Sequence, residues 1–502
     1  CIHKLAICYG KLDKNEDAAE LFEKHLKDFE WSGAYWVLLA FYKKMVGDFE
    51  TAFGASYTAI KKFDQSSSAT WRIISACAAE TKRWKQLYDV SKRYIDKGSN
   101  YTSDLIEAYL NSCLQLEEKY ADEAINFLKT TSFNWRNYSI ITGMAAGLYT
   151  LKGELETAVY LNEKALELSP NDISIKWNLS LAQLRTGRFM EGFKNYEIRW
   201  LWPEFPSPRR TFEKPNFNTI SEKDLESHTY KNSKIMVWYE QGIGDQLRFF
   251  SALPKFAEEF PNLIIEPSRK TEVLLNNTFP NIPTRVDNFN VETLHALKED
   301  FDFHMPLGDM FFYVMRKYGN QLLDKNFSVM KSYLIADKLR DIYWRDKLNH
   351  LSQKPKIGFA WRSGIVDKKR SSYYTNLKQW EKLFKNPNFS FVNLQYDLSH
   401  DELLNEHPEV KDYFLDTGFL DQRDDLEGAQ ALISNLDFVI STASTPGMMA
   451  SASGVPTVIY HKPNIWSFGR IGKFVKNPIY ENTLSYHTIT IKNNDELVND
   501  IS

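Results

Sequence analysis

Three loops of this sequence carry residue types that could do chemistry, and each follows a short apolar run. They are Gln241-Gly242-Ile243-Gly244-Asp245, residues 362–372 and residues 441–447. Loops at the carboxyl ends of parallel strands collect ligands, because turns and helix N-termini there present unpaired backbone N–H groups. The three loops therefore predict ligand sites, provided that the runs before them are strands of parallel sheets.

The apolar runs alternate with helix-length segments, as that condition requires. The pattern predicts strands at 234–240, 262–268, 356–361, 389–395, 437–442 and 457–461, and helices at 245–260, 377–384, 425–436 and 447–453. Alternating strands and helices imply right-handed βαβ units and parallel sheets. The second half of the chain is therefore predicted to be α/β, with two Rossmann-like domains and a cleft between them.

The first half is repetitive. Its period is 34 residues, that of a tetratricopeptide helix pair: Ala124, Ala158 and Gly192 mark one phase, and Gly153 and Gly187 fall at inter-helix turns. The unit around residues 83–94 departs from the period and is predicted to be irregular. Stacked helix pairs would form an α-solenoid, whose groove could bind a protein or peptide or merely support the second half of the chain.

Composition shifts set the predicted domain boundaries. The α-solenoid covers 1–200, a linker rich in Pro, Ser and charge covers 201–233, and the two Rossmann-like domains cover 234–350 and 355–502. The chain starts at Cys1 in mid-pattern without an initiator Met, which predicts that the true start lies upstream.

The net charge of −3, with 25% charged residues, argues against a broad electrostatic hold on nucleic acid or an anionic membrane. The longest wholly apolar run, residues 34–42, is about half the ~18 residues that span a bilayer, so a soluble protein without a transmembrane segment is predicted. The four cysteines form no C-x-x-C pair, which favours reduced thiols in a cytoplasmic protein. Zinc-ligand spacing, a phosphate-binding P-loop and a G-x-S-x-G elbow are all missing from the sequence.

An ordered set of short motifs resembles a known group. "YEQGIGDQLRFFSALP", "FDFHMPLGDM", "IGFAWRSG", "KKRSS", "FVNLQ", "ALISNLDFVIS" and "ASGVP" occur in the order found in bacterial and phage tetratricopeptide proteins with a glycosyltransferase-like GT-B region. These are related to the ADP-heptose:lipopolysaccharide transferases and, more distantly, to O-linked N-acetylglucosamine transferases. The resemblance covers about residues 140–480.

The resemblance implies transfer of a sugar from a nucleotide diphosphate to an acceptor, which needs a base for the acceptor proton and positive groups for the departing diphosphate. Asp245 falls on the position of the relatives' base. It could instead merely cap a helix, because Asp is a preferred N-cap residue. Gln241, Gly242 and Gly244 would form the cleft loop around it, the glycines giving backbone room for a substrate or simply turn geometry.

The resemblance places further residues at the donor. Arg362 and Ser363 follow a predicted strand, and Arg370 and Ser371 match the group's Arg-Ser pair; a guanidinium suits phosphate oxygens, although "DKKRSS" could be a solvated basic loop. Gln395 would lie near the nucleoside, or it could be a strand-end amide bonded to a neighbouring turn.

The third loop is the expected diphosphate site. Ser444 and Thr445 can donate hydroxyls and Gly447 a backbone N–H, while ordinary capping of the following helix is the alternative. Relatives carry an Asp-Thr pair and then a His here, where this chain has Ala443-Ser444 and Met448. That departure puts catalysis in doubt more than it does the fold.

The sequence thus predicts a cytoplasmic glycosyltransferase with a nucleotide-sugar donor and a glycan or protein acceptor. The alternative is a non-catalytic tetratricopeptide scaffold or binding protein with a degenerate glycosyltransferase domain. Because GT-B enzymes generally hold the diphosphate with protein cations and helix dipoles, neither a metal nor a cofactor is expected.

Overall fold

The computed structural model describes residues 2–98, 101–116, 118–221, 230–322, 332–364, 374–398, 400–410, 413–461, 472–477, 479–487 and 499–501. The chain divides into two compact units, residues 1–179 and 180–502. The division falls inside one helix, α12 (Ile173–Thr186).

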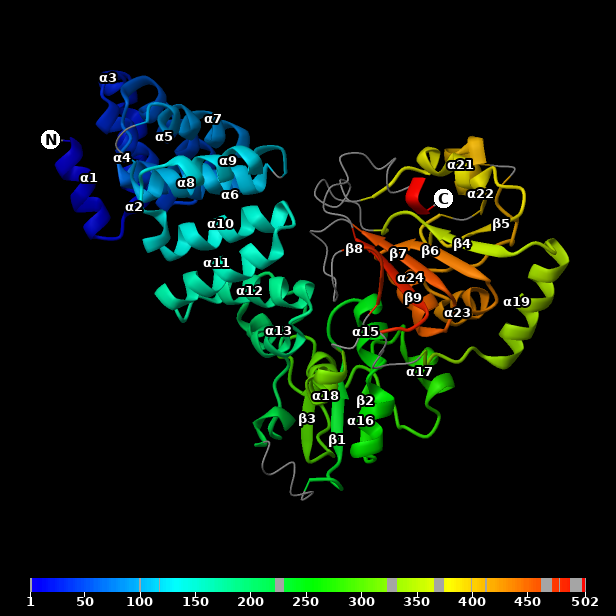
Figure 1. The fold of residues 1–502 in the computed structure, drawn as a ribbon. Helices are drawn as coiled ribbons and strands as arrows, with labels where there is room; N and C mark the ends of the chain where they lie inside the picture. Colours follow the sequence, from blue (N-terminus) through cyan, green and yellow to red (C-terminus); the bar gives the residue numbers. More distant parts are fainter. Residues whose placement is uncertain are drawn as a thin grey trace. The chain divides into compact units, whose positions relative to one another are not determined.

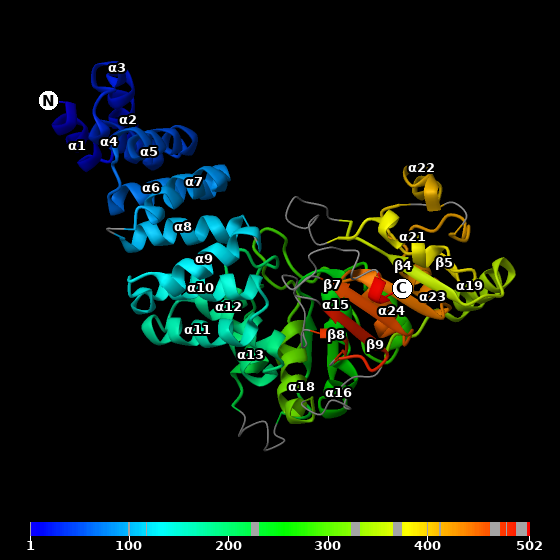
Figure 2. The ribbon, with the colours of Figure 1, turned by 45° about the horizontal axis from the view of Figure 1, so that its top comes forward.

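The first unit consists of helices that pair in sequence (Figures 1 and 2). The helix pairs α1–α2, α4–α5, α6–α7, α8–α9 and α10–α11 each pack together, and each of these pairs contacts the next in this series. The helices are α1 (Ile2–Lys11), α2 (Asn15–Lys24), α3 (Leu26–Phe29), α4 (Gly33–Met45), α5 (Phe49–Phe63), α6 (Ser68–Thr81), α7 (Trp84–Asp96), α8 (Ser103–Gln115), α9 (Glu118–Thr130), the 3₁₀ turn η1 (Trp135–Asn137), α10 (Ser139–Leu151), α11 (Leu155–Leu168) and the start of α12.

The inter-helix turns share one backbone conformation. A residue with positive φ lies between the two helices of a pair in several repeats: Asp13, Gly47, Lys82, Gly153 and Gly187. This left-handed residue stops the first helix and reverses the chain, which is why glycine recurs at the position. The predicted helical repeat is confirmed, and its turn tolerates Asp or Lys as well as Gly.

The predicted irregularity lies elsewhere than expected. Residues 83–94 belong to a regular helix, α7, while α5, α7, α9 and α11 begin 35, 34 and 37 residues apart. The longer interval contains the connection 131–138 with its 3₁₀ turn, where the Trp135 indole is buried and donates to the carbonyl of Leu128 at 2.9 Å. The prediction failed because Ala124 is not equivalent to Ala158: Ala124 is the seventh residue of α9, whereas Ala158 is the fourth residue of α11, and the extra loop residues lie between them.

The second unit begins with the end of α12, α13 (Phe189–Tyr196) and the 3₁₀ turns η2 (Glu197–Leu201) and η3 (Phe217–Thr219), and then forms a parallel sheet of order β2-β1-β3 (Figure 1). The strands are β1 (Ile235–Trp238), β2 (Leu263–Glu266) and β3 (Phe303–Pro306), and the helices are α15 (Ile243–Phe250), α16 (Leu253–Glu259), α17 (Glu272–Thr278) and α18 (Leu307–Leu322). We call this part the first lobe. The single helix predicted over 245–260 is two helices, because Pro254 starts a new helix at its first turn.

The rest of the unit, which we call the second lobe, is built on a sheet of order β5-β4-β6-β7-β9-β8. Its pairs are parallel except for the edge pair β8–β9. The elements are α19 (Lys338–Leu351), β4 (Lys356–Ala360), η4 (Leu377–Trp380), α21 (Glu381–Phe384), β5 (Ser390–Asn393), α22 (His400–Glu406), η5 (Pro408–Val410), α23 (Leu426–Ser434), β6 (Phe438–Thr442), α24 (Thr445–Ala452), β7 (Thr457–His461), β8 (Gly472–Lys476) and β9 (Thr483–His487). The predicted fold class, helical repeats followed by two Rossmann-like lobes, is confirmed.

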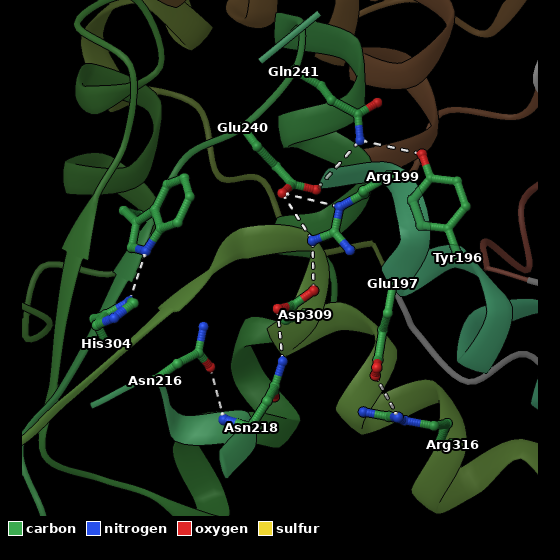
Figure 3. A network of polar contacts seen from close by, with 11 residues as sticks. Tyr196, Glu197, Arg199, Asn216, Asn218, Glu240, Gln241, His304, Asp309 and Arg316 are labelled. Carbon is green, nitrogen blue, oxygen red and sulfur yellow. Dashed lines mark hydrogen bonds and ion pairs between the residues drawn. The ribbon is translucent and has the colours of Figure 1, made fainter. Parts of the chain in front are cut away.

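A buried network of charged side chains connects η2, the segment that follows β1 and the start of α18 in the first lobe (Figure 3). The Arg199 guanidinium, fully buried, donates to Glu240 at 3.0 Å and to Asp309, which also accepts from the Asn218 amide at 2.6 Å. Burial raises the pKa of the Glu240 carboxyl, although the nearby Arg199 cation lowers it in part. Because Glu240 directly precedes Gln241, these charges fix the entrance of the first predicted loop.

The segment 201–221, predicted as part of a linker, packs on the first lobe. Arg210 forms a buried ion pair with Glu266, and the Phe212 ring stacks on His304 with centroids 3.8 Å apart. Burial, aided by the charge of Arg209, lowers the pKa of His304 to about 4, so this imidazole is neutral at pH 7 and accepts from the Trp238 indole at 3.2 Å.

Gly308→Ala is expected to destabilise the protein by about 3 kcal/mol. A Cβ at Gly308 would lie 2.1 Å from the Glu240 Oε1 atom and 3.3 Å from Arg199 Nη2, and the buried ion pair gives that carboxylate no room to move. Thermal unfolding measures the effect. The control is Gly54→Ala in α5, where no heavy atom lies within 4 Å of the added methyl and stability should stay equal or rise. Equal melting of both variants would contradict the assigned packing.

Candidate functional site

A cavity of about 540 Å³ lies in the second unit between the two lobes. The loops that follow β1, β4, β5 and β6 all reach it, so the carboxyl ends of both sheets point into one space. The volume falls within the ~300–1,000 Å³ typical of small-molecule sites. Its described lining includes Gly242, Ile243, Gly244, Asp245, Arg248, Lys270, Ser363, Gly364, Tyr396, Asp397, Gln422, Arg423, Leu426, Ala443, Ser444, Thr445, Pro446 and Met448.

Asp245 is the carboxylate of the first loop that faces the cavity. It is the third residue of α15, whose N-cap is Gly242, and 31% of its side-chain surface stays open. Burial among protein atoms raises the pKa of the Asp245 carboxyl, and the Arg248 cation and the Gly242 backbone N–H lower it in part. The N-cap position belongs to Gly242, so Asp245 is not the N-cap residue that the alternative interpretation predicted; its carboxylate belongs to the cavity lining.

Not all of the other residues of this loop line the cavity. Gly242 and Gly244 line the cavity, whereas Gln241 does not: its amide donates to Glu240 at 3.3 Å and to the Tyr196 hydroxyl at 3.5 Å (Figure 3). The left-handed turn residue is Gln241, with φ of 62°, rather than either glycine. A Cβ on Gly244 would make ordinary contact with Thr445 at 3.6 Å, so this glycine marks a close approach of the two lobes.

The third predicted loop begins α24. Ser444 is its N-cap residue but makes no side-chain cap bond; its hydroxyl lies 3.1 Å from the Ser441 hydroxyl instead. Ser444 and Thr445 line the cavity. Gly447 packs against β6, where an added Cβ would lie 2.9 Å from Ser441 Oγ, and it is outside the lining. Glycine is needed there for helix–strand packing.

Two helix N-termini, those of α15 and α24, therefore open into the same cavity, and the helices contact one another. Neither has a capping side chain at its N-cap residue. The first N–H groups of a helix lack intrahelical partners, and the helix dipole is positive at that end. Their convergence makes this part of the cavity favourable for an anion.

Arg362 and Gln395 form a polar cluster with Asp397, and of these three residues Asp397 alone lines the cavity. The Arg362 guanidinium pairs with Asp397, and its backbone N–H donates to the Gln395 side chain at 3.2 Å. The Gln395 amide donates in turn to Asp397 at 2.7 Å, and Gln395 is fully buried. This matches the predicted alternative for Gln395, a strand-end amide bonded to a neighbouring turn.

Ser363 does line the cavity, next to Gly364 and Tyr396. The Tyr396 hydroxyl accepts from the Gly364 backbone N–H at 2.6 Å and lies 3.3 Å from Ser363 Oγ. Arg370 and Ser371, the second predicted phosphate pair, lie outside the described residues.

The lining contains cations that the sequence did not single out: Arg248, Lys270 and Arg423. Arg248 sits one helical turn after Asp245, and Lys270 bridges the lobes by pairing with Asp424. A second bridge joins Asn277 to Glu427 at 2.7 Å. Periodicity could have indicated Arg248, because residues i and i+3 share a helix face; Lys270 and Arg423 gave no local signal.

Within the described ranges, no group of three or more His, Cys, Asp or Glu side chains is arranged to hold a metal ion. Nor does any helix in that part of the chain have the length and apolar character needed to cross a membrane.

The chain is similar to a curated protein and to two kinds of solved structure. No protein-family model matches the chain. Protein FlbA of Caulobacter vibrioides is 26% identical over 331 residues, which cover 63% of this chain and 53% of FlbA, so the chain spans about half the length of this curated relative.

Two kinds of solved structure are each similar to part of the chain. ADP-heptose lipopolysaccharide heptosyltransferase II of E. coli is 13% identical, with 53% of this chain and 97% of that chain covered and a TM-score of 0.36. A thermophilic tetratricopeptide protein of Thermus thermophilus is 20% identical, with 36% and 96% covered and a TM-score of 0.26. The chain is thus similar to tetratricopeptide proteins and to glycosyltransferases, the two groups that its motifs resemble. Any assignment of function rests on the cavity itself.

Proposed function

We propose that this protein is a metal-independent glycosyltransferase that transfers a sugar from a nucleotide-diphosphate donor to a hydroxyl-type acceptor. The observation that carries the proposal is the convergence of Asp245 and the N-termini of α15 and α24 on one cavity between two Rossmann-like lobes. A carboxylate and an anion-binding corner are the two elements that the reaction needs.

In the proposed reaction the acceptor oxygen forms a bond to the anomeric carbon of the sugar, and the bond from that carbon to the phosphate oxygen breaks. Asp245 takes the proton of the acceptor, and the nucleoside diphosphate leaves with the electron pair. The raised pKa of Asp245 suits this task, since a carboxylate that is more basic than usual takes a proton more readily.

The leaving diphosphate would lie at the start of α24. Ser444 and Thr445 line the cavity there, and the N-terminus of α15 is close by. Preorganised donors of this kind stabilise charge as it develops and need no metal ion. The nucleoside would then extend toward the apolar lining on α23, which includes Leu426, Ala429 and Ile433.

Partners and location complete the proposal. The acceptor is a glycan or a protein, and the helical repeats of the first unit are proposed to hold a protein partner. A cytoplasmic location fits the free thiols of Cys8, Cys77 and Cys113, because disulfides are rare in that compartment.

The first test is thermal unfolding with UDP, ADP, GDP and CMP. A ligand that binds only the folded protein adds about 2.7 kcal/mol of stability at 100 times its Kd, so at least one nucleoside diphosphate should raise the melting temperature by several degrees. EDTA should leave the shift unchanged. If no nucleotide changes the melting temperature, the proposal is wrong.

The second candidate function is a non-catalytic binding protein. It is favoured by one observation: residues 441–449 include no ionisable side chain, and their only polar side chains are hydroxyls. A protein of that kind would show a nucleotide-dependent shift without releasing sugar from any donor. Chromatographic detection of released sugar separates the two candidates.

A further inference from the structure

The start of α24 has a positive backbone but no positive side chain of its own. Residues 441–449 read Ser-Thr-Ala-Ser-Thr-Pro-Gly-Met-Met. One of the first helical positions is Pro446, which has no N–H to donate, and Gly447 lies outside the cavity lining. A departing diphosphate carries two or more negative charges, so this corner alone offers it few donors.

Arg248 reaches this corner from the opposite lobe. Its guanidinium lies 3.5 Å from Asp245 Oδ1 through Nη1 and 3.6 Å from the Met448 sulfur through Nη2. It lines the cavity although only 11% of its side-chain surface is exposed. A single guanidinium therefore stands between the carboxylate of the first loop and the first turn of α24.

We propose that Arg248 binds the leaving diphosphate from the first-lobe side of the cavity and supplies the positive side chain that residues 441–449 lack. The inference rests on the proposed glycosyltransferase function and adds a specific binding residue to it. A guanidinium can face a carboxylate with one N–H edge and a phosphate with another, which an ammonium cannot do with the same fixed geometry.

The other cations of the lining are less well placed for this task. The Lys270 ammonium forms an ion pair with Asp424 and donates to the backbone carbonyl of Arg423, and its side chain is partly exposed to solvent. Arg423 is exposed on the segment before α23. Solvent-exposed charges are screened by salt and water, whereas a largely buried guanidinium is screened much less in its attraction to a neighbouring anion.

The test is isothermal titration calorimetry of the full chain with the nucleoside diphosphate that shifts the wild type and with the matching nucleoside. Arg248→Gln should weaken nucleoside diphosphate binding about tenfold to a hundredfold and leave nucleoside binding unchanged, because only the diphosphate contact is lost. Arg248→Lys should fall between the variant and the wild type. In steady-state assays the donor KM should rise in both variants.

Arg316→Gln is the matched control, since Arg316 also belongs to the first lobe, pairs with Glu197 and lies away from the cavity. It should bind like the wild type. If the wild type binds no nucleoside diphosphate, the proposed function and the role of Arg248 are both wrong. If the wild type binds and Arg248→Gln binds equally well, or loses the nucleoside and the diphosphate to the same extent, only the role of Arg248 is wrong. Circular dichroism of each variant verifies folding, and Arg248→Lys decides the matter if Arg248→Gln fails to fold.

Discussion

Asp245→Asn is expected to lower the rate of sugar transfer about a hundredfold to ten-thousandfold, the usual contribution of a positioned general base. The amide is similar in size to the carboxylate, and Asp245 is not the N-cap residue of α15, so the helix start and the cavity keep their shape. Nucleoside diphosphate affinity should not fall. The variant therefore separates binding from chemistry.

The pH dependence of the wild type gives an independent check on this role. A base works only when deprotonated, so activity should rise with pH through the pKa of Asp245. Burial raises that pKa, and the acidic limb should therefore lie above the pH range of an ordinary aspartate. Loss of the Arg248 cation should move the limb to still higher pH, because that cation stabilises the charged form.

The control for this variant is Asp287→Asn. Asp287 is an acidic residue of the first lobe that pairs with Arg269 away from the cavity, and its positive φ of 54° is readily adopted by Asn. Transfer rates should match the wild type. Equal rates for Asp245→Asn and the wild type would remove Asp245 from the mechanism while leaving the nucleotide site in place.

Arg199→Met is expected to destabilise the second unit by about 3–5 kcal/mol, the range for breaking a buried ion pair from one side. Its removal leaves Glu240 and Asp309 buried and facing each other without a cation. Denaturant unfolding measures the loss. Arg316→Gln, which removes a partly exposed pair, should cost no more than about 1 kcal/mol.

The Arg199→Met defect should shrink as the pH is lowered. Without the guanidinium the folded-state pKa of Glu240 rises further above its unfolded value, so the penalty applies at pH values above that folded pKa and disappears as the carboxyl takes a proton. The difference in the free energy of unfolding between wild type and variant should thus be smaller at pH 5 than at pH 8. A gap that is constant over this range would mean that lost packing, rather than charge, causes the effect.

The fold could be predicted from the sequence because its signals are local. Each predicted strand run is apolar, short and bounded by turn residues, and β1, β2, β4, β5, β6 and β7 lie within these runs. β3 (Phe303–Pro306) was missed, because Asp302 and His304 interrupt its apolar pattern. The loop 241–245 and Ser444 were found because they directly follow such strands. Pro254 divides a helix that the pattern alone predicted as continuous.

The site residues were harder to predict because their roles depend on partners far along the chain. Arg362 and Gln395 follow strands as predicted, yet Asp397 holds both in a cluster beside the cavity. Arg199 meets Asp309 across 110 positions, a pairing that no local pattern records. In the sequence, Arg248 is one more polar residue of an amphipathic helix. Its position at the cavity becomes evident only from its contact with Met448 of α24.

Polar contacts join the lobes. Lys270 forms an exposed ion pair with Asp424, and the Asn277 amide donates to Glu427. In the proposed reaction, any separation of the lobes that lets a donor in or a product out would have to break these contacts. Since ionic strength weakens exposed charge pairs, salt would make this separation easier. It would also weaken binding of the anionic nucleotide in the cavity. Catalytic throughput would then peak at an intermediate salt concentration, set by the balance between capture and escape.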